Sequence, residues 1–180
     1  MLAQEAHSQL ELDRVLLVPT GQAPHKRIDP EPGPDVRLEM ARLAVEGDER
    51  FEVSALEVGR DGPSYTHETL QELADREPQR ELHLVIGADV ALGLGSWRQP
   101  ERIVELARLA VAPRVGVDRD AVDAALKGLG AAERAEFLDM PAVEVSSSLV
   151  RERIGAGRPV RFLVPDRVAE LIESEGLYRS

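Results

Sequence analysis

Hydroxyl and basic side chains meet at the start of a predicted helix near the end of the sequence. The run Ser146 to Ser148 precedes an apolar helical pattern, and Arg151 follows about one turn later. Free amides at a helix start, together with hydroxyls and an arginine, form a phosphate-binding arrangement. A serine at this place is also a common N-cap, which accepts a hydrogen bond from the helix's own amides. The sequence therefore predicts either a phosphate site or a structural cap.

A second cluster of basic residues, His25, Lys26 and Arg27, lies in a long loop rich in proline and glycine. This loop follows a predicted strand at residues 15–18, and such loops commonly carry ligand contacts. The three side chains could bind phosphate. Basic residues on a loop are also often merely hydrated, so the composition leaves both interpretations open.

A third candidate lies where the segment Gly62 to Thr66 turns the chain into a predicted helix at residues 66–76. Ser64, Thr66 and the exposed amides of this helix start could bind a carboxylate or a phosphate. A plain hydroxyl cap is the alternative. His67 follows in the first turn, where we expect its side chain to point into solvent.

Further polar candidates follow two buried strands, predicted at residues 82–86 and 109–112. Asp89 lies at the carboxyl edge of the first strand, where it could cap the next helix or bind a ligand hydroxyl or a hydrated cation. Trp97, the only tryptophan, lies in a polar segment next to a proline, so ligand contact and core packing are both open. Arg114 adds a positive charge just after the second strand.

Strands and helices alternate along the sequence, which is typical of an α/β domain with a parallel sheet. Apolar runs predict strands at residues 15–18, 82–86, 109–112 and 142–145, and alternation of apolar with polar or small residues predicts another at residues 51–58. Helical periodicity predicts helices at residues 1–12, 35–46 with Asp35 as its cap, 66–76, 100–106 and 165–175, and helical pieces between residues 118 and 137. Because this length suits one domain of ordinary size, we expect residues 1–180 to form a single α/β domain.

The charge and composition exclude several classes of protein. A formal net charge of -11 argues against sequence-independent binding to nucleic acid or to an anionic membrane surface, since both need a basic footprint. The absence of cysteine excludes a thiolate nucleophile, a disulfide framework and a cysteine zinc site. No apolar run approaches the length of a membrane span, and the first residues lack the features of a signal peptide, so we expect a cytoplasmic protein.

Six segments of the sequence match, in order, the motifs of one enzyme family. They are VPTGQAPHKR at 18–27, GPSYTHETL at 62–70, IGADVALGLGSWRQP at 86–100, VAPR at 111–114, VSSSLVRERI at 145–154 and FLVPDRVAELIESEGLY at 162–178. Each segment alone is a weak signal, whereas six in the family's order are specific. By these residues the chain resembles the bacterial nicotinate-nucleotide adenylyltransferases of the nucleotidyltransferase superfamily, whose fold is a Rossmann-like doubly wound parallel sheet.

The resemblance implies an enzyme that joins nicotinate mononucleotide to the adenylyl group of ATP, giving deamido-NAD and pyrophosphate in the synthesis of NAD, with Mg²⁺. The residues it implies fall into two groups. On the ATP side are Ser146, Ser147, Arg151 and Arg114, with His25 and Lys26 as catalytic residues that close over the reacting phosphates. On the mononucleotide side are Thr66, His67, Asp89 and Trp97, with the Trp97 ring stacked on the pyridine.

One part of the family's pattern is not found in these residues. Family members begin with a strand and a G-G-x-F-D-P-x-H-x-G-H turn that contacts the nucleotide phosphates, and Met1 here matches a position just after that turn. We therefore expect the first, central strand of the sheet to be missing from residues 1–180. Two alternatives stay open: another member of the superfamily, such as a pantetheine-phosphate adenylyltransferase or a cytidylyltransferase, and a non-catalytic nucleotide-binding remnant.

Overall fold

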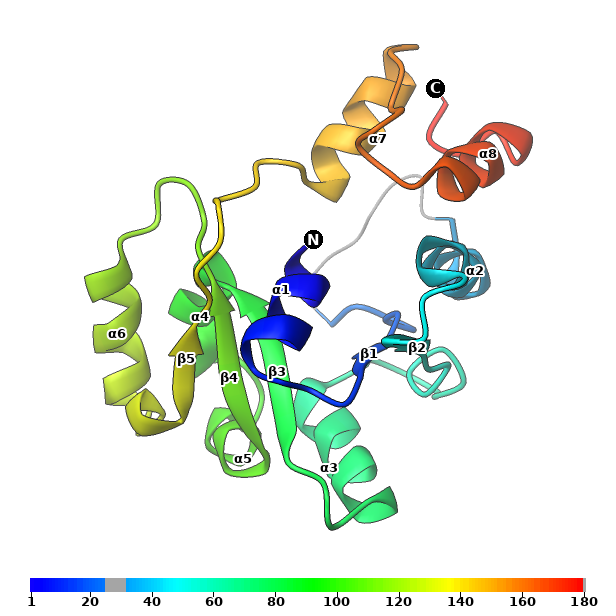
Figure 1. Cartoon of the computed structure of the whole chain (residues 1–180). Coiled ribbons are helices and arrows are strands. Elements are labelled where there is room, and N and C mark those ends of the chain that lie inside the picture. The colour runs from blue at the N-terminus through cyan, green and yellow to red at the C-terminus, as the bar shows by residue number, and fades with distance from the viewer. Residues whose placement is uncertain (25–31, 180) are drawn as a thin grey trace. The chain divides into compact units, whose positions relative to one another are not determined.

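The computed structural model describes residues 1–24 and 32–179 (Figure 1). The chain divides into two compact units, each built from two stretches of sequence. Unit 1 comprises Met1–Asp13 and Tyr65–Glu144, and unit 2 comprises Arg14–Ser64 and Val145–Ser180. Both units combine parallel strands with helices, as the α/β prediction requires. Within the described residues, no helix is both long enough and apolar enough to span a bilayer.

Unit 1 contains a parallel sheet in the order β3 (Leu82–Gly87), β4 (Ala107–Ala112) and β5 (Ala135–Phe137). Strand β4 lies between its two neighbours, and Figure 1 shows the three side by side. Five of the six residues of β4 are buried and apolar, because a central parallel strand is covered on both faces, and the sixth is the partly buried Arg108.

Helices cover both faces of this sheet, as in a doubly wound fold. Alternate side chains of a strand point to opposite faces, so Leu84 and Ile86 join one apolar cluster while Val85 packs in another with Ala6. The helical elements of unit 1 are α1 (Leu2–Gln9), α3 (Thr66–Arg76), α4 (Ala88–Gly93), a 3-10 turn (Leu94–Ser96), α5 (Pro100–Leu106), α6 (Arg119–Gly128) and a second 3-10 turn (Ala132–Arg134). Helices α4, α5 and α6 contribute to the larger cluster, whereas α1 belongs to the smaller one.

Unit 2 contains the parallel pair β1 (Val15–Leu17) and β2 (Phe51–Val53), with helices α2 (Pro34–Val45), α7 (Ser147–Gly155) and α8 (Asp166–Ser174). An ion pair of 3.0 Å between Arg167 Nη1 and Glu46 Oε2 joins α8 to the end of α2. The predicted stop of the last helix is confirmed, since Gly176 has a φ of 61°, a conformation that glycine adopts at little cost.

The predicted helices at residues 66–76 and 100–106 are confirmed, but the predicted cap at Asp35 is wrong. Helix α2 begins at Pro34 after Gly33, whose φ is 84°, and no side chain caps it. Proline is favoured at the first helical position because its missing N–H has no helical partner there. This preference moves the helix start one residue ahead of the acid.

Two predicted strands also differ from the structure. Strand β2 ends at Val53, and the alternating sequence after it forms a turn in which the Gly59 and Arg60 amides donate to the carbonyls of Ala55 and Glu57. The strand predicted at residues 142–145 is absent from the described structure, and the third strand of unit 1 is formed instead at residues 135–137. That segment was predicted as helical because three residues are too few to show a strand's periodicity. Its pairing with β4 is a tertiary contact.

Asp118 caps helix α6, since its carboxylate accepts a hydrogen bond of 3.1 Å from the Asp120 amide. We predict that Asp118→Ala lowers the free energy of unfolding by about 1 kcal/mol, because a helix amide loses its acceptor. Asp118→Asn is the matched control, as its side-chain oxygen can still accept that bond. Chemical denaturation of the three proteins measures the difference, and equal losses in both variants would contradict a capping role.

Candidate functional site

The start of helix α3 presents donors that are not used within the described structure. The amides of Glu68 and Thr69 donate to the carbonyl of Tyr65, at 3.0 and 3.2 Å. Those of Thr66 and His67, and the Thr66 hydroxyl, have no partner among the described residues. The hydroxyl-cap alternative is therefore wrong for this helix. Free amides at the positive end of an 11-residue helix attract an anion.

Ser64, the other residue expected to cap α3, has a different partner. Its hydroxyl oxygen accepts a hydrogen bond of 3.2 Å from the Gly21 amide, and its side chain is buried. A methyl group added at Gly21 would lie 2.1 Å from the carbonyl oxygen of Glu57, so only glycine fits there. Arg37 also binds this segment, donating from Nε at 3.1 Å and Nη2 at 2.6 Å to the Thr20 carbonyl. These contacts fix the chain just before the basic loop.

The segment containing Trp97 lies against the start of α3. The guanidinium carbon of Arg98 is 4.5 Å from the centre of the Tyr65 ring, a cation–π distance. Arg98 has no carboxylate partner among the described residues. Trp97 is half-buried and packs against the larger apolar cluster, so part of this residue stays exposed. The structure thus brings Thr66 and Trp97, predicted from separate motifs, to neighbouring segments.

Asp89 lies in the first turn of α4 but does not cap it, so that alternative is wrong. Gly87 occupies the N-cap position, and no side chain hydrogen bonds to the helix start. A side chain at Gly87 would meet Asp89 Oδ1 at 2.5 Å, which shows that the carboxylate folds back over the end of β3. Asp89 is exposed and makes no hydrogen bond or ion pair with the described residues. Its oxygens remain available to accept a ligand hydroxyl.

His67 is buried, and the expectation that it points into solvent is wrong. Only 7% of the residue is exposed, and its Nδ1 has no partner among the residues described. The ring centre lies 5.9 Å from that of Tyr65, while Nε2 is 3.8 Å from Glu68 Oε1. A histidine one turn before Leu70 lies on the same helix face as that buried leucine, and this spacing was the signal for its burial.

Arg114 and Asp89 follow neighbouring strands at one edge of the sheet in unit 1. The register pairs Gly87 at the end of β3 with Ala112 at the end of β4, so both strands end at the same edge of the sheet. Arg114 Nη1 donates a 2.9 Å hydrogen bond to the Val143 carbonyl and thereby holds the segment that follows β5. The carboxyl edge of a parallel sheet is where ligands bind in such folds.

The predicted cap at the start of α7 is confirmed. Ser146 Oγ accepts a hydrogen bond of 3.2 Å from the Leu149 amide. Arg151 Nη2 donates to Ser148 Oγ at 3.2 Å, so the guanidinium is tethered to the same first turn. The amides of Ser147 and Ser148 have no partner among the described residues. Two free amides and a tethered guanidinium on one helix start can bind phosphate oxygens.

The predicted site residues are distributed over both units. Unit 1 contains Thr66, His67, Asp89, Trp97 and Arg114, and unit 2 contains Ser146, Ser147 and Arg151. His25, Lys26 and Arg27 lie outside the described residues. Two residues next to the candidate site were not predicted from the sequence. Arg98 stacks on Tyr65, which is a tertiary contact, and Arg37 donates to the Thr20 carbonyl, a contact that sequence spacing does not indicate.

Known proteins resemble this chain over most of its length. A sequence model of the cytidylyltransferase-like family matches residues 1–153. A probable nicotinate-nucleotide adenylyltransferase of Roseiflexus sp. (strain RS-1) is 42% identical over 178 residues, covering 99% of this chain and 89% of the relative. A protein of the same name from Clostridium tetani is 32% identical over 180 residues, covering 99% and 90%.

A solved structure shares the fold. It is the Plasmodium falciparum nicotinic acid mononucleotide adenylyltransferase complexed with NaAD, with a TM-score of 0.79 over 97% of this chain and 87% of that chain. Its sequence identity is 16%, so the likeness concerns the fold, and it confirms the Rossmann-like α/β prediction. From the family match and the two relatives, the chain belongs to the cytidylyltransferase-like family of nucleotidyltransferases and, within it, to the nicotinate-nucleotide adenylyltransferases.

Proposed function

We propose that this chain transfers the adenylyl group of ATP to nicotinate mononucleotide, giving deamido-NAD and pyrophosphate. The observation that carries the proposal is the stacking of Arg98 on Tyr65, which holds the Trp97 segment against the start of α3. An aromatic ring surface next to free amides suits a pyridine ring that bears a carboxylate. The names of the relatives, which align over 99% of the chain, support the same reaction.

The reaction is a single displacement at phosphorus. An oxygen of the mononucleotide phosphate attacks the α-phosphorus of ATP, and the bond from that phosphorus to the oxygen bridging to the β-phosphate breaks. The electron pair leaves with pyrophosphate, and no atom is oxidised or reduced. Such a displacement needs positioning and charge neutralisation rather than a protein nucleophile. The chain therefore needs no cysteine or activated serine for this chemistry.

On the ATP side, the free amides of Ser147 and Ser148 and the guanidinium of Arg151 would bind phosphate oxygens. Ser146 would keep the helix start in place, because its hydroxyl caps it. His25 and Lys26 would close over the reacting phosphates, and Arg114 would add positive charge. Mg²⁺ would enter bound to ATP. Among residues 1–24 and 32–179, no group of three His, Asp or Glu side chains gathers as a metal site.

On the mononucleotide side, the Trp97 ring would stack on the pyridine, and Thr66 with the free amides of α3 would bind its carboxylate. Asp89 would accept hydrogen bonds from the ribose hydroxyls. His67 would support the Tyr65 ring and not contact the ligand, because its side chain is buried beside that ring. A neutral amide cannot exploit the positive helix start as a carboxylate does, so nicotinate mononucleotide should be preferred over nicotinamide mononucleotide.

Pyrophosphate release tests this proposal against its alternatives. The chain is incubated with MgATP and, in turn, nicotinate mononucleotide, nicotinamide mononucleotide or phosphopantetheine, and then with MgCTP in place of MgATP. We expect the fastest release with MgATP and nicotinate mononucleotide. Faster release with phosphopantetheine or with CTP would favour another member of the superfamily, and no release in any mixture would favour a non-catalytic protein.

The cytoplasmic location expected from the sequence stays a prediction.

A further inference from the structure

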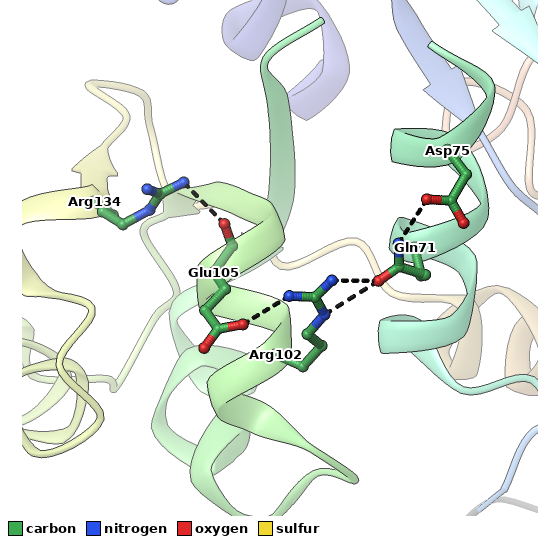
Figure 2. A network of polar contacts seen from close by, with 5 residues as sticks. All are labelled: Gln71, Asp75, Arg102, Glu105 and Arg134. Carbon is green, nitrogen blue, oxygen red and sulfur yellow. Dashed lines mark hydrogen bonds and ion pairs between the residues drawn. The ribbon is translucent and has the colours of Figure 1, made fainter. Parts of the chain in front are cut away.

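One arginine joins α3, whose first residues form part of the proposed pyridine site, to α5, which begins three residues after Trp97. Arg102 of α5 donates from Nε at 3.1 Å and from Nη2 at 2.5 Å to the side-chain oxygen of Gln71 on α3 (Figure 2). Two donors of one planar guanidinium on a single oxygen fix both direction and distance. The link therefore sets the spacing between α3 and α5 at this point.

Neighbouring groups hold both partners of this link in place. The Gln71 amide nitrogen donates to Asp75 Oδ1 at 2.8 Å, so the amide oxygen faces Arg102. Arg102 Nη1 donates to Glu105 Oε2 at 2.8 Å, which fixes the guanidinium from its other side. Figure 2 shows the four side chains in one chain of contacts from α3 to α5.

The link lies close to the proposed site along both helices. Gln71 is five residues after Thr66, and Arg102 is five residues after Trp97. Between Trp97 and α5 the backbone passes through Gln99, whose φ of 51° and ψ of 56° are left-handed and costly for a residue with a side chain. A strained residue persists where its surroundings hold it. Arg102 holds α5, the helix that begins directly after Gln99.

The side chains around this link are polar, in contrast to the apolar packing on the other side of the two helices. A hollow of about 500 Å³ lies here, lined only by polar and charged side chains that include Gln71, Gln99 and Arg102. Leu70 and Ile103 anchor the two helices in the apolar core on their other side. Loss of the link should change the spacing at the site while the core stays intact.

We propose that Arg102 is a positioning residue, which acts through Gln71 to hold the Trp97 segment at the correct distance from the start of α3. Its effect on nicotinate mononucleotide rests on the function proposed above. Arg102 does not touch the substrate in this account. It should therefore alter the affinity for the mononucleotide and leave the affinity for ATP almost unchanged.

The test is a double-mutant cycle with Arg102→Ala, Gln71→Ala and the double variant. Arg76→Ala is the matched control, since Arg76 lines the same hollow but pairs within α3, with Glu72 at 2.6 Å. Two readouts use Trp97, the only tryptophan: fluorescence titration with nicotinate mononucleotide, and acrylamide quenching without ligand. The Kd for MgATP is measured by calorimetry.

We expect each single variant to raise the Kd for nicotinate mononucleotide about fivefold, and the double variant to add little to that, because both changes break one link. The Kd for MgATP should stay within about twofold, as should all values of Arg76→Ala. Acrylamide quenching of Trp97 should rise equally in all three variants that lack the link. If Arg102→Ala fails to fold, Gln71→Ala still reports on the same contact.

Independent losses that multiply in the double variant would overturn the proposal, and so would equal losses for MgATP. Unchanged quenching in Gln71→Ala would overturn it without reference to any ligand. If no protein binds the mononucleotide but quenching rises in the expected pattern, the positioning role stands and the proposed function fails.

Discussion

Replacing Arg151 by alanine should lower kcat with MgATP and nicotinate mononucleotide by about 10²-fold or more. The guanidinium is tethered to Ser148 Oγ at 3.2 Å, beside the free amides of Ser147 and Ser148. In the proposed reaction, negative charge builds on the leaving pyrophosphate, and a fixed cation next to those oxygens stabilises it more in the transition state than in bound ATP. Steady-state kinetics at saturating substrates measures the loss.

A matched control for Arg151 lies on the same helix. Arg153→Ala removes the same charge, but Arg153 binds the Pro159 carbonyl through Nε at 3.1 Å and Nη2 at 2.9 Å and is not on the first turn. We expect this variant to retain kcat within a few-fold. Comparable losses in both variants would show that α7 responds to its net charge, which would contradict a specific phosphate contact at Arg151.

Trp97→Ala should weaken the binding of nicotinate mononucleotide by about 1 to 3 kcal/mol, because a stacked aromatic ring is lost. The Kd for MgATP should change by no more than about twofold, since no stacking on adenine is assigned to this residue. Calorimetric titration of the two ligands measures both constants. Trp97→Phe is the matched control, as it keeps an aromatic surface and should retain most of the affinity.

The half-buried position of Trp97 makes a structural outcome equally testable. Its side chain packs against the larger apolar cluster, so Trp97→Ala will also lower the free energy of unfolding. Equal losses of affinity for MgATP and for the mononucleotide would assign the tryptophan to the core alone. A loss confined to the mononucleotide supports the stacking role.

The buried elements of this fold were predictable from the sequence. The strands at residues 82–87 and 107–112 contain the apolar runs 84–86 and 109–112, because helices cover both faces of the sheet, and such a run is a local pattern. Helix α5 begins at a proline, and α3 has a strong apolar periodicity, so both were predicted with their observed bounds. Asp89 directly follows the first of these strands, and Trp97 lies just before α5, so the same elements place both residues in the fold.

Other features depend on contacts that local sequence does not record. Strand β5 has only three residues and exists because β4 offers it an edge to pair with. The alternating residues after Val53 looked like strand, but their amides bond within a turn. His67 is polar, yet its helix face turns it inward. The Arg102–Gln71 link joins residues 31 positions apart, and no spacing rule predicts it.

The most direct test of the central claim is to follow the α-phosphate of ATP. The chain is incubated with MgATP that carries a radioactive α-phosphate and with nicotinate mononucleotide, and the products are separated and identified by mass spectrometry. The proposed reaction predicts that the label appears in deamido-NAD and not in pyrophosphate. Label found only in free AMP or ADP, with the mononucleotide unchanged, would contradict adenylyl transfer to nicotinate mononucleotide.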